Sequence, residues 1–119
     1  MPPIKDYFSF LTVETIEKKI KRLGSGISHL GLAPEINEFE DFKVKFVGIY
    51  SRNSLEWLLT DIACSYYGFT VVPIYDTLGE EATKEMFEQT NLTTLFLTCA
   101  HLQGIIKNFE KGNTGKVKN

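Results

Sequence analysis

Three short apolar runs, separated by segments with helical periodicity, are the feature that most constrains this chain. The runs cover Phe46–Tyr50, Thr70–Ile74 and Thr94–Leu97. Their apolar residues are continuous rather than alternating, which is typical of strands buried on both faces and therefore of a parallel sheet. We predict an α/β fold with a mostly parallel sheet of three or four strands joined by crossover helices.

The helical segments carry their apolar residues at steps of three and four. One stripe predicts a helix from about residue 13 to residue 30, ended by Gly31, and another predicts a helix over residues 54–67, ended by Gly68. The stripe residues are Val13, Ile16, Ile20, Leu23, Ile27 and Leu30, followed by Leu55, Leu58, Leu59, Ile62, Ala63 and Tyr66. Gly24 and Gly26 lie inside the first helix, and we interpret them as permitting close packing against a neighbour, since each costs roughly 1 kcal/mol of helix propensity relative to alanine.

Capping patterns predict where the later helices begin. Asn53 with Glu56 fits a capping box for helix 54–67, and Thr77 with Glu80 fits one for the next helix. A last amphipathic helix is outlined by Leu102, Ile105, Ile106 and Phe109.

Two segments offer little to a core. Residues 33–43 are acidic, precede the first apolar run and are predicted to form a surface connector. Residues 111–119 contain one apolar side chain, Val117, so this tail is expected to fray.

Charge and cysteine content limit the class of protein. The 119 residues fit one globular domain, and 13 basic against 15 acidic residues give a net charge of −2 and a pI near 5.7. No positive field favours polyanions, so no nucleic-acid partner is expected. Cys64 and Cys99 lack CxxC spacing and lie in apolar contexts, so both are predicted to be reduced core residues of an intracellular protein.

Export and membrane insertion are not expected. The N-terminus lacks the apolar segment of a signal peptide. The stretch from Trp57 to Tyr75 is long enough to cross a bilayer, but it contains Asp61 and Pro73, which favour a buried helix followed by a buried strand. We therefore predict no transmembrane segment.

The polar residues best placed for a ligand follow two of the strands. In open parallel sheets, ligands bind beyond the carboxyl ends of the strands. The residues at these ends are Ser51, Arg52, Asn53, Tyr75, Asp76 and Thr77. Arg52 beside a helix start could bind an anion, but capping and solvation account for the same residues, and Asp76 is more simply interpreted as stabilising its loop.

No residue is assigned a catalytic, cofactor-binding or metal-binding role. His29 and His101 have no neighbouring group that would make either a general base or a metal ligand, so both are interpreted as surface or boundary residues. Neither cysteine and none of the serines lies in a recognisable nucleophile motif.

Three stretches of the sequence are nevertheless distinctive: Gly48–Trp57, Ala63–Gly68 and Val71–Ala82, the last containing Tyr-Asp-Thr-Leu-Gly. Together they resemble the N-terminal part of long-chain acyl-CoA synthetases, members of the AMP-binding, adenylate-forming superfamily. The resemblance spans nearly the whole chain, from an expected strand at Tyr7–Phe10 to Lys111, and implies that residues 1–119 are part of the large N-terminal domain.

This resemblance implies a two-step ligase. ATP and a fatty acid give an acyl-adenylate and pyrophosphate with Mg²⁺, and coenzyme A then displaces AMP to give the thioester. The family's phosphate loop, of Thr-Ser-Gly-Thr-Thr-Gly type, has no counterpart in the 119 residues. We therefore expect a fragment that lacks activity and binds no cofactor by itself.

The resemblance also implies partners and a location. The expected partner is the missing remainder of the synthetase domain, and a homo-oligomer is a further expectation. The family implies a cytoplasmic protein or one bound peripherally to endoplasmic reticulum or peroxisome membranes. The alternative is a stand-alone interaction or regulatory module that binds a full-length synthetase through its sheet edge.

Overall fold

The computed structural model describes residues 8–119, and it contains four helices and four strands within that range. In chain order they are α1 (Val13–His29), β1 (Glu35–Phe39), β2 (Phe42–Tyr50), α2 (Leu55–Tyr67), β3 (Thr70–Ile74), α3 (Glu80–Thr90), β4 (Leu95–Leu97) and α4 (Cys99–Glu110). The α/β fold and the three expected strands of the parallel sheet are confirmed.

The sheet is mixed, with a parallel centre. β2 is the central strand: its second half pairs in parallel with β3 on one side and with β4 on the other. Gly48 is paired with both Val72 and Leu95, and its amide donates to the carbonyl of Thr94 at 3.0 Å. A Cβ atom here would lie only 2.9 Å from Leu95, so the residue between the two neighbours must be small.

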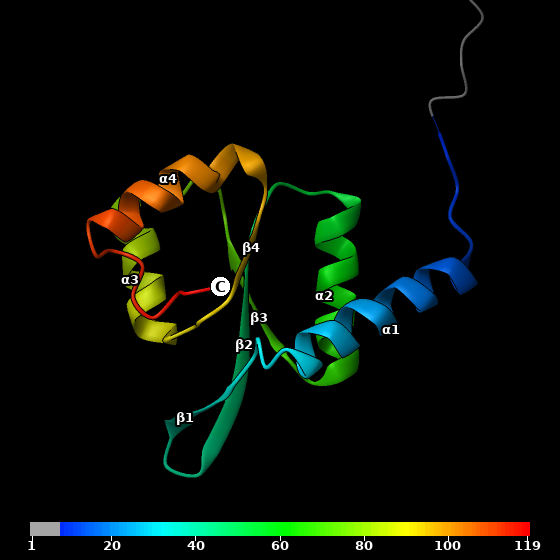
Figure 1. Ribbon diagram of the computed structural model, residues 1–119, viewed down its shortest axis with the longest axis horizontal. Helices are drawn as coiled ribbons and strands as arrows, with labels where there is room; N and C mark the ends of the chain where they lie inside the picture. The colour runs from blue at the N-terminus through cyan, green and yellow to red at the C-terminus, as the bar shows by residue number, and fades with distance from the viewer. Residues whose placement is uncertain (1–7) are drawn as a thin grey trace, which may run out of the picture.

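The prediction of a surface connector at residues 33–43 is wrong, because residues 35–43 form the first arm, the turn and the start of the second arm of a hairpin. β1 pairs antiparallel with the first half of β2, matching Ile36 with Val44 and Phe39 with Phe42, and the chain turns through Glu40, whose φ is +50°. The hairpin extends away from the helices (Figure 1). Apolar and polar residues alternate from Phe42 to Phe46 in the second arm, a strand signal that the acidic composition of the preceding residues obscured.

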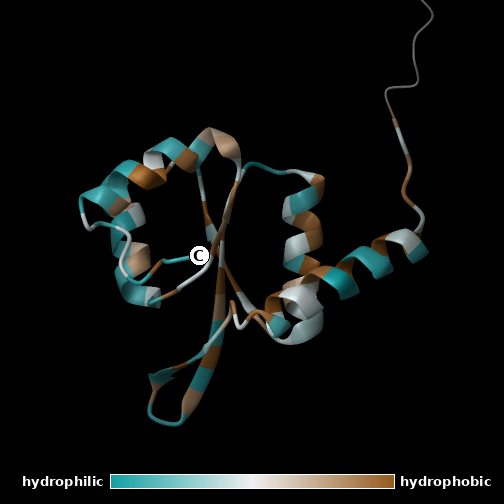
Figure 2. Cartoon of the chain, in the orientation of Figure 1, coloured by the Kyte–Doolittle hydropathy of each residue, from teal (hydrophilic) through white to brown (hydrophobic). Residues whose placement is uncertain are grey.

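Helices cover both faces of the parallel part of the sheet: α3 and α4 lie on one face, α1 and α2 on the other (Figure 1). Figure 2 shows hydrophobic residues concentrated on the central strands between these layers. Successive residues of β3 and β4 enter different clusters, as expected for strands buried on both faces: Val72 and Leu95 join Phe87 and Ile105, whereas Val71 and Phe96 pack against the cluster that contains Ile27 and Cys64. The two-sided burial is confirmed.

Two helix starts differ from the prediction. α2 is capped by Ser54, whose hydroxyl accepts from the amide of Trp57 at 3.1 Å, rather than by Asn53. α3 begins after Gly79, which makes no side-chain cap, rather than after Thr77. The glycine stops are confirmed: Gly31 and Gly68 have φ values of +62° and +72°, in the left-handed region that glycine adopts without strain.

The outward-facing parts of both predicted helical stripes are not buried in this chain. Val13 on α1 and Leu30, which follows this helix, are exposed, and Leu55, Leu58 and Tyr66 are exposed on α2. α2 instead presents Thr60, Ala63 and Cys64 inward, because these small residues let the helix approach the sheet and α1 closely. Leu58, which the sequence predicts in the core, is 49% exposed.

Close packing at the first of the two glycines of α1 is confirmed. A Cβ atom on Gly24 would lie 2.1 Å from the ring of Tyr67, whereas one on Gly26 would meet nothing within 4 Å. The Tyr67 hydroxyl also donates to the carbonyl of Lys21 at 3.0 Å. The Tyr67 ring of α2 therefore packs directly on the backbone of α1 at Gly24. The prediction that Gly26 also permits close packing is wrong.

The two ends of the chain differ from the prediction as well. Residues 8–12 form no strand, and Tyr7 of the expected strand lies outside the described residues. The tail 111–119, expected to fray, folds back against β4: Thr114 is buried, Val117 packs on the core, and Asn119 shares backbone hydrogen bonds with Thr93 and Leu95. Backbone pairing, which composition does not reveal, holds this segment.

Candidate functional site

The six polar residues predicted at the carboxyl ends of the strands line one hollow. Three of them follow the end of β2 and three follow the end of β3. The two loops are 24 positions apart in the sequence and face each other. The lining residues of this hollow, of about 480 Å³, are Ser51, Arg52, Asn53, Tyr75, Asp76 and Thr77. The sheet topology explains why they lie together, since the parallel neighbouring strands β2 and β3 end at the same edge of the sheet.

An ion pair joins the two loops. The Nε atom of Arg52 donates to Oδ2 of Asp76 at 2.8 Å, and this hydrogen bond holds the pKa of Asp76 below its usual value. The pair ties the start of α2 to the loop before α3. Asp76 therefore stabilises this edge through Arg52, a partner that the sequence did not identify.

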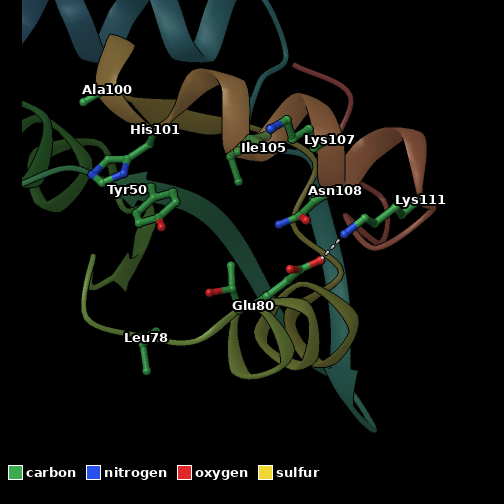
Figure 3. Close-up of a pocket in the computed structure, with 11 residues that line it drawn as sticks. Tyr50, Leu78, Glu80, Ala100, His101, Ile105, Lys107, Asn108 and Lys111 are labelled. Carbon is green, nitrogen blue, oxygen red and sulfur yellow. Dashed lines mark hydrogen bonds and ion pairs between the residues drawn. The ribbon is translucent and has the colours of Figure 1, made fainter.

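A second hollow, of about 270 Å³, lies beside the first, between α3 and α4 (Figure 3). Tyr50, the last residue of β2, stacks on His101 of α4 with ring centroids 4.1 Å apart and an angle of 9° between the planes. At the other end of the hollow, Nζ of Lys111 donates to Oε1 of Glu80 at 3.0 Å. Figure 3 shows both contacts, which fix α4 over the carboxyl end of the sheet.

Sequence reasoning missed the stacking of His101. His29 is exposed and His101 is half-buried, which fits their interpretation as surface or boundary residues. The stacking of His101 on Tyr50 was not predicted. A signal was present in principle, because a side chain near the start of a helix that follows one strand can reach the end of the neighbouring strand. The pairing could not be chosen without the order of the strands, which places β4 next to β2.

The two cysteines have different environments. Cys64 is buried on the inner face of α2, and burial, with a smaller contribution from Asp61, raises the pKa of its thiol to about 11. Cys99 is exposed at the start of α4, so the prediction that it belongs to the core is wrong. Burial and the raised pKa both disfavour the reactive thiolate, and so Cys64 is a packing group rather than a nucleophile.

The carboxyl-edge hollow does not fit ATP with Mg²⁺. Asp76 is its one carboxylate and is held by Arg52, whose charge is thereby partly neutralised. Within residues 8–119 there is no group of three histidine, cysteine or acidic side chains that could hold a metal ion. None of the helices in the described range is long and apolar enough to cross a membrane.

Comparison with known proteins identifies the family. Residues 4–119 match the model of the AMP-binding enzyme family. The chain is 31% identical over 86% of its length to the peroxisomal acyl-CoA ligase 891 of Penicillium roqueforti, and 36% identical over 71% of its length to the peroxisomal long chain acyl-CoA synthetase 6 of Arabidopsis thaliana. It spans only 14% and 11% of these two relatives.

A solved structure shares the fold. The luciferase-like enzyme of the mealworm Zophobas morio superposes with a TM-score of 0.70 over 89% of this chain and 23% of that enzyme, at 20% sequence identity. The family predicted from the sequence motifs is thus confirmed by the sequence comparisons and agrees with the fold. The chain belongs to the AMP-binding enzyme family.

Proposed function

We propose that these 119 residues are the opening segment of the large domain of a long-chain fatty-acid–CoA ligase. In the reaction proposed for the whole enzyme, the carboxylate of a fatty acid attacks the α-phosphorus of ATP, releasing pyrophosphate. Coenzyme A then displaces AMP from the acyl-adenylate to give the acyl-CoA. The observation that carries the proposal is the match of nearly the whole chain to the family model, together with relatives named as long-chain ligases.

Within that enzyme, the segment would serve as scaffold. The parallel sheet β3–β2–β4 and its two helical layers position two loops at one edge, but the sequence has no glycine-rich phosphate loop and the carboxyl-edge hollow does not fit ATP with Mg²⁺. ATP, Mg²⁺ and coenzyme A are accordingly proposed as cofactors of the longer enzyme rather than ligands of these residues alone.

A chimeric enzyme tests this assignment. The 119 residues replace the matching segment of the Arabidopsis thaliana synthetase, and acyl-adenylate and palmitoyl-CoA formation from ATP, palmitate and coenzyme A are measured. We expect activity from the chimera, but none from the 119-residue chain or from the synthetase with the segment deleted. Acyl-adenylate formation by the 119-residue chain, or a chimera that folds like the parent yet is inactive, would contradict the proposal.

The exposed apolar residues of α2 support a second candidate function. Leu55, Leu58 and Tyr66 present hydrophobic surface on one helix, which is typical of a surface that contacts another protein. In this role the chain would act as a module that binds a full-length synthetase. Titration of the labelled chain against such a synthetase would show saturable binding that Leu58→Asp abolishes, and the absence of binding would exclude this role.

We also propose an intracellular location, in the cytoplasm or peripherally on endoplasmic reticulum or peroxisome membranes. The names of the Penicillium roqueforti and Arabidopsis thaliana relatives, both peroxisomal, support this proposal. Imaging of the tagged chain beside organelle markers tests it, and appearance of the protein in the medium would contradict it.

A further inference from the structure

Gly26 leaves open space on the outer face of α1. A Cβ atom at this position would meet nothing within 4 Å, so packing among residues 8–119 does not account for the glycine. Inside a helix, glycine costs roughly 1 kcal/mol relative to alanine. Another use of glycine is to let a ligand approach the backbone closely, and the side chains around Gly26 fit that use.

The open space at Gly26 is part of a hollow of about 540 Å³, where α1 meets the end of α2. The other lining residues are Lys21, Arg22, Ser25 and His29 of α1 and Tyr67 of α2. Arg22, Ser25 and His29 follow one another at steps of three and four, which brings them onto one face of the helix. Cationic groups, a hydroxyl group and an imidazole therefore surround the uncovered backbone.

The positive charges of this hollow are accessible to a ligand. Arg22 and His29 are exposed, and none of the ion pairs among residues 8–119 includes either of them. Lys21 is paired with Glu17 at 2.7 Å, with 48% and 57% of the two side chains exposed. Exposed pairs of this kind are weak, so an anion of higher charge can replace Glu17 as the partner of Lys21.

We propose that this hollow binds a phosphate monoester, either a soluble ester or the headgroup of phosphatidic acid. Lys21 and Arg22 supply two positive charges for the dianion, and the planar guanidinium of Arg22 suits contact with two phosphate oxygens at once. The Ser25 hydroxyl donates a further hydrogen bond, and Gly26 leaves room for the phosphate against the helix. The negative end of the α1 dipole acts only within the last turn, so it opposes an anion near His29 more than one held by Lys21 and Arg22.

Titration of the 119-residue chain with glycerol 3-phosphate, followed by NMR of the backbone amides, tests this site. We expect saturable shifts of the Ser25 and Gly26 amides. Arg22→Gln should raise the dissociation constant by at least about fivefold, because it removes a charge-assisted contact. Lys19→Gln is the matched control, since Lys19 is an exposed cation of the same helix that does not line the hollow, and it should change the constant by less than about twofold.

Gly26→Leu tests the same site without changing its charge. Because space is open around Gly26 and leucine is the better helix former, this variant should fold at least as stably as the parent. Its side chain fills the hollow, so the dissociation constant for glycerol 3-phosphate should again rise by at least about fivefold.

Vesicles distinguish the two sources of the phosphate. Cosedimentation compares phosphatidylcholine vesicles containing phosphatidic acid with vesicles brought to equal surface charge by phosphatidylserine. A preference for phosphatidic acid that Arg22→Gln removes would assign the site to a lipid headgroup, whereas binding of glycerol 3-phosphate without this preference would assign it to a soluble ester.

Two results would overturn the proposal. One is the absence of saturable shifts with glycerol 3-phosphate together with equal binding to both kinds of vesicle. The other is an equal loss of binding in Arg22→Gln and Lys19→Gln, which would mean that only the general charge of α1 attracts anions. The site lies within α1 and the end of α2 and none of these readouts involves catalysis, so its failure is distinct from failure of the chimeric enzyme.

Discussion

The two helical layers that cover the sheet are built on different principles. On one face, α1 and α2 approach closely because small residues line the contact, with Gly24 lying against the ring of Tyr67 and Ala63 fully buried. On the other face, α3 and α4 are held by large side chains around Phe87 and Ile105. The first layer should therefore tolerate added atoms poorly, and the second should be most sensitive to atoms removed.

The largest effect is expected from removing Phe87, at the centre of the α3–α4 layer. Its side chain is 0% exposed. Phe87→Ala should lower the free energy of unfolding by about 3 to 5 kcal/mol through lost burial and a residual cavity, as measured by urea titration. Phe109→Ala is the matched control, because this residue is 63% exposed on α4. A comparable loss in both variants would show that the layer does not depend on a central packed residue.

Replacing each glycine of α1 by alanine tests whether the α1–α2 layer is sensitive to added atoms. Gly24→Ala should destabilise the protein by about 1 to 3 kcal/mol, because the new Cβ meets the Tyr67 ring. Gly26→Ala makes the same change in the same helix where space is open, and it should stabilise by about 0.5 to 1 kcal/mol through helix propensity. Thermal denaturation of both variants should give shifts of opposite sign, and equal shifts would contradict the close approach of α1 and α2.

Sequence reasoning predicted the central strands from their continuous apolar runs and the helices from apolar residues at steps of three and four, because both signals are local in the chain. The features that it missed depend on partners distant in sequence. Whether Leu58 or Ala63 faces inward is decided by where α1 and the sheet meet α2, and both residues belong to the same apolar stripe. The tail was misjudged for the same reason, since Asn119 is held through its backbone.

The candidate site also has one part that was predictable from the sequence and another that was not. Topology predicted that the loops after β2 and β3 would meet, and the structure confirms that they line one hollow. The individual contacts in and beside the hollow were not predictable, because they depend on the order of the strands and on the side-chain rotamers. Arg52 with Asp76 and Tyr50 with His101 are the examples.

Alkaline pH provides a further test of the α1–α2 layer, through Cys64. Its pKa is about 11 in the folded protein against 9.0 for the ordinary thiol, so between these values the unfolded chain releases a proton that the folded chain keeps. The contribution of Cys64 to stability is thus fully present below pH 9 and is lost as pH rises, by about 1.4 kcal/mol at pH 10. Urea titrations at pH 8 and pH 10 should show this loss in the parent and in Cys99→Ala, but not in Cys64→Ala.

The smallest effect is expected where the two layers meet, at the ion pair of Arg52 and Asp76. Arg52 is 85% exposed, and exposed pairs contribute little because water and salt screen them, so Arg52→Gln should barely move the thermal midpoint at neutral pH.

The pKa of Asp76 should respond more clearly to the same substitution. Its pKa is lowered by the hydrogen bond from Arg52, so the pair favours the folded state above pH 4, and this contribution disappears as pH falls through the lowered pKa. NMR titration of the Asp76 carboxyl should show its pKa rising toward the usual value in Arg52→Gln, with Lys84→Gln as a control that leaves it in place. A large drop in stability from Arg52→Gln would instead mean that the loops at the carboxyl edge, rather than the packed faces of the sheet, hold the two layers together.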